Sequence, residues 1–247
     1  AQLSRGLGDV YKRQHLANAA MPPISQSAKD ALIKAATIRQ ELGLACIEYG
    51  MEDYIKVRQD FASFIGVEPE QFAFFQTCAS AISQVALGLR YEKDQHILGI
   101  EGEYPSNAYP WNFAAQKNNI EYKRIAYNGE GEIPHQKIEE SINEKTRVVS
   151  ISWVQFHNGA VADLKFLGEL CKEYGTLLVV DGIQGLGAIP FDFKDYNIAA
   201  ICGGVHKWMC GPLGLGFLAL KQELIAELQP LSAVSYTHLT LPTIGCV

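Results

Sequence analysis

The sequence predicts an α/β protein built on a mostly parallel, doubly wound sheet with helices on both faces. Short apolar runs rich in β-branched residues alternate with segments of helical periodicity, and this alternation is typical of parallel sheets. The runs TLLVVD (176–181) and AAICGG (199–204) are apolar almost throughout. Such runs are expected of strands that are buried on both faces of a sheet.

The chain begins its regular structure after an extended segment, HLANAAMPPI (15–24), which Pro22 and Pro23 keep from becoming helical. The first helix, 25–42, is expected to be capped by Ser25 or Ser27, and the second, 51–66, to end at Gly66. Apolar periodicity predicts further helices over 79–89, 106–118, 135–145 and 163–175. Strands are predicted over 72–77, 96–104, 120–127, 147–156, 176–181, 199–204 and 213–220.

Composition limits the classes of protein to which the chain can belong. Its 247 residues are 48% hydrophobic, which suffices for one α/β domain with a full core. The net charge of -6 and the lack of basic runs argue against nucleic acid or an anionic membrane as a partner. No apolar run approaches the roughly 20 residues of a membrane span. The six cysteines show no paired metal spacing, so we expect no metal and a reduced, cytoplasmic setting.

The two ends of the chain are related in an unexpected way at the level of DNA. The segment DVYKRQ (9–14) can be encoded by a sequence whose reverse complement, read in another frame, encodes VSYTHL (234–239). Two ends of a natural protein have no reason to encode opposite strands of one sequence. We therefore expect 1–14 and 234–247 to be translated sequencing adaptor, and we exclude them from fold reasoning. The natural portion is expected to be 15–233.

An acid and a lysine occupy the ends of two predicted strands. Asp181 closes the run 176–181, and Lys207 follows the run 199–204. The carboxyl ends of parallel strands face the ligand crevice of an open α/β sheet. Pyridoxal phosphate requires such a pair, because its aldehyde forms a Schiff base with a lysine and its ring nitrogen pairs with a carboxylate. Taken singly, Lys207 could be an ordinary strand-end lysine and Asp181 a helix N-cap.

Three motifs together resemble the class V aminotransferase family, namely DGIQ (181–184), HK (206–207) and GPLGLGF (211–217). This family includes cysteine desulfurases, selenocysteine lyases, kynureninases, isopenicillin-N-epimerase-like proteins and aminotransferases. The resemblance runs from about His15 to about Ala233. It implies the large domain of aspartate-aminotransferase-like (fold type I) enzymes, without their C-terminal small domain, and a homodimer in the complete protein.

The resemblance assigns roles to four of these residues. Lys207 is the expected Schiff-base lysine and catalytic residue, and Asp181 the partner of the ring nitrogen. Gln184 is expected to bind the ring hydroxyl, where the alternative is a polar loop residue. His206 is expected to lie against the cofactor phosphate. Gly204 stands where desulfurases have the serine of a Ser-x-His-Lys motif, so the resemblance to desulfurases weakens at this position.

Two further segments carry cofactor-binding candidates. In TCASAIS (77–83) a strand meets a helix, whose first amides are suited to phosphate; by family position Cys78 and Ala79 supply them. An ordinary capped helix is the alternative. The segment EGEYPSNAYPW (101–111) resembles the family pattern E-x-x-x-N-x-x-P-W. We expect Tyr104 to stack on the cofactor ring, with a core tyrosine as the alternative.

Two classes of function follow from these residues. The first is a pyridoxal-phosphate enzyme acting on an amino acid, either an aminotransferase or an epimerase-like enzyme. Within that class, a cysteine desulfurase, selenocysteine lyase or kynureninase-like lyase is the alternative. The second class is a non-catalytic scaffold of the same fold, which the retention of Asp181 and Lys207 argues against. The resemblance implies that a substrate-binding arginine and any mobile cysteine lie past Ala233, so we expect the chain alone to be inactive.

Overall fold

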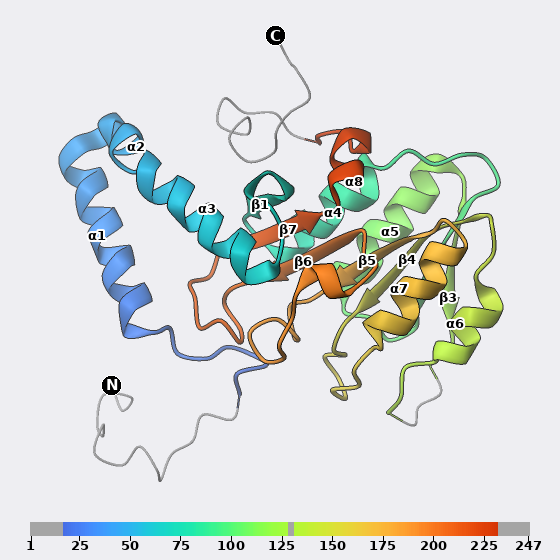
Figure 1. The fold of residues 1–247 in the computed structure, drawn as a ribbon. Coiled ribbons are helices and arrows are strands. Elements are labelled where there is room, and N and C mark those ends of the chain that lie inside the picture. The colour runs from blue at the N-terminus through green and yellow to red at the C-terminus, as the bar shows by residue number, and fades with distance from the viewer. Residues whose placement is uncertain (1–16, 128–130, 232–247) are drawn as a thin grey trace.

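The computed structural model describes residues 17–127 and 131–231 (Figure 1). Their centre is a seven-stranded sheet in the order β1-β7-β6-β5-β4-β2-β3. The strands are β1 (Phe72–Phe75), β2 (His96–Ile100), β3 (Glu121–Ile125), β4 (Thr146–Ser152), β5 (Leu177–Asp181), β6 (Ala200–Gly204) and β7 (Gly216–Leu220). Strands β3, β2, β4, β5 and β6 are parallel, whereas β7 is antiparallel to both β6 and β1. The predicted mostly parallel sheet is confirmed.

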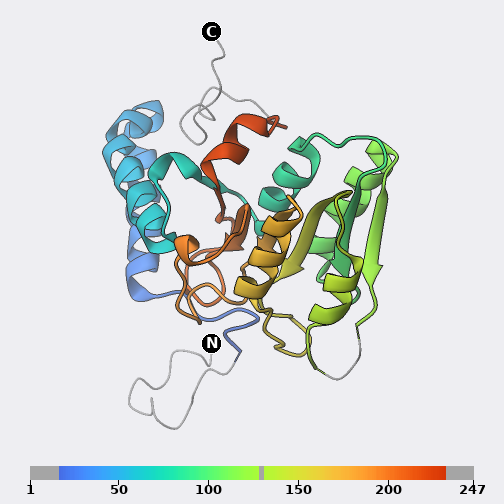
Figure 2. The same ribbon diagram turned by 45° about the vertical axis from the view of Figure 1, so that its right-hand side comes forward.

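Helices cover both faces of this sheet (Figures 1 and 2). The α-helices are α1 (Gln26–Leu42), α2 (Cys46–Tyr49), α3 (Met51–Ile65), α4 (Cys78–Gly88), α5 (Pro105–Asn118), α6 (His135–Ser141), α7 (Leu164–Glu173) and α8 (Gln222–Glu227). Helices α4, α5 and α8 contribute to the core on one face, and α3, α6 and α7 to the core on the other. The doubly wound arrangement is therefore confirmed as well.

The alternation of side chains along the central strands explains why both faces are apolar. In β5, Leu178 and Val180 join one core while Val179 joins the other. In β6, Ile201 and Cys202 divide in the same way. Because successive residues of a strand point to opposite faces, an unbroken apolar run places a core on each side of the sheet.

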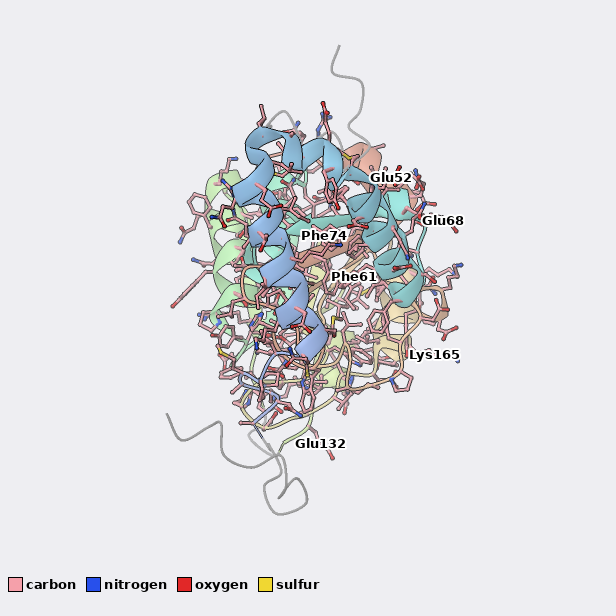
Figure 3. The ribbon with its side chains drawn as sticks, turned by 90° about the vertical axis from the view of Figure 1, so that its left-hand side faces the viewer. Glu52, Phe61, Glu68, Phe74, Glu132 and Lys165 are labelled. Carbon is pink, nitrogen blue, oxygen red and sulfur yellow. The ribbon has the colours of Figure 1, made fainter. Side chains whose placement is uncertain are left out.

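The N-terminal helices begin and end where local chemistry predicts. Ser25 caps α1, its side chain accepting a hydrogen bond from the Ala28 amide. Gly66 ends α3 in the left-handed conformation at a φ of 86°. On α3, Phe61 packs edge-to-face on Phe74 of β1, with ring centroids 5.5 Å apart. Figure 3 shows these two rings on the side of the molecule that carries α1 and α3.

Several predicted boundaries are wrong, and the strands are shorter than their apolar runs. The run 96–104 leaves the sheet after Ile100, because the chain turns at Gly102 with a φ of 77°. The run 147–156 leaves it after Ser152 and enters a tight turn, in which the Gln155 amide donates to the Ala160 carbonyl. Other ranges shrink as well, such as the strand 213–220 to 216–220, the strand 72–77 to 72–75, the strand 120–127 to 121–125 and the helix 135–145 to 135–141. The short helices α2 and α8 were not predicted.

Three predictions concern membrane spans, metal sites and the origin of the two ends of the chain. Within 17–127 and 131–231, no helix is both long and apolar enough to cross a membrane. The same residues contain no metal-binding cluster, and their five cysteines are free thiols. The expectation that 1–14 and 234–247 are adaptor lies outside the described residues.

Candidate active site

Asp181 and Lys207 lie on neighbouring parallel strand ends. Asp181 is the last residue of β5, and it pairs across the sheet with Cys202 of β6. Lys207 follows β6 by three residues, in the turn that begins after Gly204. The predicted placement of the acid and the lysine is thereby confirmed. Their roles toward a cofactor stay predictions.

Asp181 is a buried carboxylate with one oxygen committed to the protein. Its side chain is 2% exposed. Oδ1 accepts hydrogen bonds from the Ile183 amide (3.0 Å) and from the Cys78 thiol (3.3 Å), and Oδ2 accepts none from the described residues. Burial raises the pKa of Asp181 to about 6, and the charge of Glu103 acts in the same direction. The carboxylate is therefore poised to gain a cationic or N–H partner at Oδ2.

Lys207 is a half-buried amine close to an aromatic ring. Its Nζ lies 5.8 Å from the centroid of the Tyr104 ring. Burial lowers the pKa of Lys207, while the charge of Asp181 opposes that shift. No described acidic side chain forms an ion pair with it. A lysine with a lowered pKa supplies more neutral, nucleophilic amine at neutral pH.

The N-terminus of α4 offers two free amides beside this pair. Thr77 is the N-cap, and Thr77 and Ser80 satisfy each other's amides through their hydroxyl oxygens at 3.0 and 3.1 Å. The amides of Cys78 and Ala79 find no acceptor among the described residues. Unsatisfied amides at the start of a helix form an anion site. Cys78 and Ala79 thus lie at the helix N-terminus, as the predicted phosphate site requires. The helix is also capped by Thr77, as the alternative of an ordinary capped helix requires.

Strand β7 approaches this helix end so closely that only glycine fits. A Cβ on Gly216 would lie 2.5 Å from the carbonyl carbon of Thr77 and 2.8 Å from the amide nitrogen of Cys78. The missing side chain at Gly216 therefore lets the α4 N-terminus lie directly against β7.

Gln184 and His206 lie in the two turns that follow β5 and β6. The Gln184 side chain donates to the Ala19 carbonyl (2.9 Å) and accepts from the Trp208 indole (3.0 Å). His206 is partly buried; burial lowers its pKa, and Lys207 adds to the effect. A Cβ on Gly204 would lie 3.2 Å from the His206 ring. The absence of a side chain at 204 thus leaves room beside that ring.

Tyr104 stands at the rim of the site. It is the residue before α5, its side chain is 48% exposed, and its ring packs edge-to-face on Phe156 with centroids 5.1 Å apart. The alternative of a core tyrosine is wrong, because nearly half of the side chain is open. Stacking on a cofactor stays a prediction.

Glu103 belongs to the site, although the sequence analysis predicts no role for it. It is 8% exposed, and its carboxylate accepts hydrogen bonds from the Ser152 amide (2.7 Å), the Ser152 hydroxyl and the Gln155 amide group (3.0 Å). Ser152 pairs with Asp181 across the sheet. Glu103 is the first residue of the motif E-x-x-x-N-x-x-P-W, so the motif itself was the signal.

The same motif ties α5 to the sheet. Asn107 is fully buried, and its Oδ1 accepts from the Ser150 hydroxyl (2.7 Å) and from the Trp111 indole (3.2 Å). A buried Asn, a strand serine and a helix tryptophan thus fix the helix that begins beside Tyr104. These contacts support α5, while the Nδ2 of Asn107 has no hydrogen-bond partner among the described residues.

The structure thus places an acid and a lysine at neighbouring strand ends of a mostly parallel sheet, beside a helix N-terminus. The family model for Aminotransferase class-V matches residues 38–240. The chain belongs to this family.

Individual relatives carry two kinds of name. The uncharacterized aminotransferase YcbU of Bacillus subtilis is 28% identical over 173 residues, which cover 70% of this chain and 46% of that protein. A probable cysteine desulfurase of Methanothermobacter thermautotrophicus is 29% identical over 194 residues, covering 78% and 48% respectively. The chain spans about half the length of the curated relatives it matches.

Solved structures show the same fold. The cystine C-S lyase C-DES in complex with cysteine persulfide matches with a TM-score of 0.82 at 21% identity, over 87% of this chain and 59% of that one. The apo structure of the cysteine desulfurase from Thermococcus onnurineus NA1 matches with a TM-score of 0.81 at 23% identity, over 88% of this chain and 56% of that one. At these identities the likeness shows the fold alone, and the expected fold-type-I large domain is confirmed.

Proposed function

We propose that this chain is the cofactor-binding part of a pyridoxal-phosphate enzyme that acts on an amino acid through Lys207. The observation that carries the proposal is the joint placement of Asp181 and Lys207 beside the N-terminus of α4. A carboxylate, an amine and an anion site at one edge of a sheet match the three functional groups of this cofactor. A solved variant of C-DES holds glycine covalently linked to its pyridoxal-phosphate cofactor, which supports the same chemistry on this fold.

The residues fit each end of the cofactor in turn. The free amides of Cys78 and Ala79 and the nearby His206 suit its phosphate. Oδ2 of Asp181, which accepts no hydrogen bond from the described residues, suits the ring N–H. Tyr104 presents an exposed ring beside Lys207 for stacking. Gln184 suits the ring hydroxyl if its amide gives up the bond to the Ala19 carbonyl.

When bound, the cofactor supplies an electron sink for the negative charge that develops at the substrate Cα. Asp181 keeps the ring nitrogen protonated, because its buried charge has no other cationic partner in direct contact among the residues that the structure describes. Lys207, once its amine is free, takes the proton from Cα and returns it. The lowered pKa of Lys207 suits this role, since a base works best when its pKa is near the working pH.

The reaction on this platform is either transamination or a related lyase reaction. Relatives named cysteine desulfurase support the lyase reading at least as well as relatives named aminotransferase support the other. Gly204 is the feature of this chain that departs from the desulfurase motif. Incubation of the complete protein with L-cysteine separates the two, because a desulfurase releases alanine and leaves the sulfur as a persulfide on an acceptor thiol, whereas an aminotransferase forms a keto acid. We further propose a homodimer, as in other fold-type-I enzymes.

Borohydride reduction tests the covalent link directly. The protein is loaded with pyridoxal phosphate, reduced, digested and analysed by mass spectrometry. We expect the pyridoxyl group on the peptide that contains Lys207, and none on that peptide from a Lys207→Ala variant. Lys221 follows β7, which runs antiparallel to β6, so it lies at the edge of the sheet opposite to Lys207 and provides the matched control variant Lys221→Ala. Labelling of another lysine in the unaltered protein would overturn the assignment.

A further inference from the structure

We infer that the Cys78 thiol is a positioning residue that orients the Asp181 carboxylate toward the cofactor ring; this rests on the proposed function. The thiol donates a hydrogen bond to Oδ1 of Asp181 over 3.3 Å. The two residues are 103 positions apart in sequence, so the bond joins the start of α4 to the end of β5. The sequence predicts a role only for the backbone amide of Cys78, at the phosphate site, and none for its side chain.

The two oxygens of the Asp181 carboxylate differ in their hydrogen bonds. Oδ1 accepts from the Ile183 amide as well as from the Cys78 thiol, and these two donors fix the plane of the carboxylate. Oδ2 is left for a ring N–H. A carboxylate anchored through one oxygen is pre-organised to use the other, and pre-organisation of this kind improves affinity by lowering the entropy lost on binding.

The thiol is held in the form that donates. Cys78 is 4% exposed, and both burial and the neighbouring Asp181 charge raise its pKa well above the usual range of a cysteine. It therefore stays a protonated donor rather than a thiolate. A thiolate at this position would repel the carboxylate and leave Oδ1 with a single donor.

Cys78 also couples the two ends of the site. Its amide lies at the anion site of α4, and its side chain contacts the acid at the opposite end of the expected cofactor. The nearby Cys202 provides a contrast. It is fully buried and pairs with Asp181 across the sheet, yet no hydrogen bond joins its thiol to the carboxylate.

The test compares three variants against two cofactors. Cys78→Ala removes the donor, Cys78→Ser keeps one, and Cys202→Ala removes a second buried thiol of the same size. Each protein is titrated with pyridoxal phosphate and with its carbon analogue, in which C–H replaces the ring nitrogen. We expect Cys78→Ala to bind pyridoxal phosphate roughly fivefold more weakly, as for loss of one hydrogen bond from a weak S–H donor. Cys78→Ser should restore affinity, and Cys202→Ala should leave it unchanged.

The carbon analogue distinguishes orientation from packing. Because it has no ring N–H, its affinity should be the same for Cys78→Ala and for the unaltered protein. Equal weakening of both cofactors by Cys78→Ala, or equal effects of Cys78→Ala and Cys202→Ala, overturns the inference. Failure of the unaltered protein to bind pyridoxal phosphate overturns the proposed function instead.

A measurement without cofactor gives an independent readout. The pKa of Asp181 can be followed by carbon-13 NMR of its labelled carboxyl group. The Cys78 thiol stabilises the charged carboxylate, so Cys78→Ala should raise the pKa of Asp181, and Cys78→Ser should reverse the rise. An unchanged pKa in Cys78→Ala contradicts the inference whatever the protein binds.

Discussion

The side-chain nitrogen of Lys207 lies 5.8 Å from the centroid of the Tyr104 ring, over its face. A cation at this distance from an aromatic ring is stabilised by the ring quadrupole. Burial acts in the opposite sense, because it disfavours the charged amine and lowers the pKa of Lys207. The reactivity of this lysine is thus set by two opposing effects, one of which a single substitution removes.

Replacing Tyr104 with Leu should make Lys207 more reactive toward aldehydes. Without the ring, the ammonium form loses about 0.5–1 kcal/mol of stabilisation, as is typical at partly exposed sites. The pKa of Lys207 then falls further, and at a pH below it the rate of aldehyde addition should rise about two- to fivefold. The rate at which a small aliphatic aldehyde adds to Lys207, followed as a function of pH, measures this, because such an aldehyde has no ring on which Tyr104 could stack. Tyr104→Phe keeps the ring and should behave like the unaltered protein; a slower Tyr104→Leu variant would contradict the argument.

Replacing Asp181 with Asn should stabilise the cofactor-free protein while removing its cofactor site. The pKa of Asp181 is raised from 3.8 to about 6 in the folded state, chiefly by burial. A carboxyl group with a raised pKa favours folding most below pH 4, and this contribution is lost as the pH rises through 6. Its ionisation therefore costs about 3 kcal/mol of stability at neutral pH.

Urea unfolding at pH 7.5 and pH 4 measures the effect. Asp181→Asn should be more stable than the unaltered protein at pH 7.5, by up to about 3 kcal/mol, and similar to it at pH 4. The same variant should bind pyridoxal phosphate weakly, because an amide cannot hold the ring nitrogen in its protonated form. The measured quantity is the free energy of unfolding of Asp181→Asn minus that of the unaltered protein. If this difference is smaller at pH 7.5 than at pH 4, the buried charge is not costly.

Replacing Glu103 with Ala should destabilise the fold, because three hydrogen-bond donors lose their buried acceptor. The substitution leaves the Ser152 amide, the Ser152 hydroxyl and the Gln155 side chain without their acceptor. Loss of a buried charged acceptor with several donors costs about 3–5 kcal/mol. Denaturant unfolding measures this loss. Glu101→Ala, at an exposed acid two residues earlier, is the matched control and should change stability by less than about 0.5 kcal/mol.

Much of the fold and part of the site could be predicted because each rests on local pattern. Buried parallel strands such as 176–181 are unbroken apolar runs, and Ser25 and Gly66 are capping residues with few alternatives. The strand ends were harder, since the run 147–156 stays apolar after the chain has left the sheet at Ser152. Hydrophobicity reports burial, and burial continues into the turn.

The contacts that join distant segments could not be predicted. No pattern in the sequence indicates that the Cys78 side chain reaches Asp181, or that Gln184 donates to the Ala19 carbonyl. Glu103 could be recognised as the first residue of a family motif. Its burial and its three hydrogen-bond donors, however, follow from the packing of α5 against β4. Spacing identifies which residues share a site, and tertiary packing decides which of their atoms are free to bind.

Replacing Gly216 with Ala should weaken binding of the phosphate more than binding of the ring. The new Cβ would lie 2.5 Å from the Thr77 carbonyl carbon and 2.8 Å from the Cys78 amide nitrogen, both of them backbone atoms. Backbone cannot yield as a flexible side chain does, so the start of α4 must move and its free amides with it. We expect pyridoxal phosphate to bind at least tenfold more weakly, as for loss of about 1.4 kcal/mol in charge-assisted hydrogen bonds. Pyridoxal, which lacks the phosphate, should lose less affinity, by no more than the roughly fivefold expected for loss of the Cys78 thiol contact with Asp181. If the affinities for both compounds fall by the same factor, no loss is specific to the phosphate, and the helix N-terminus is not the phosphate site.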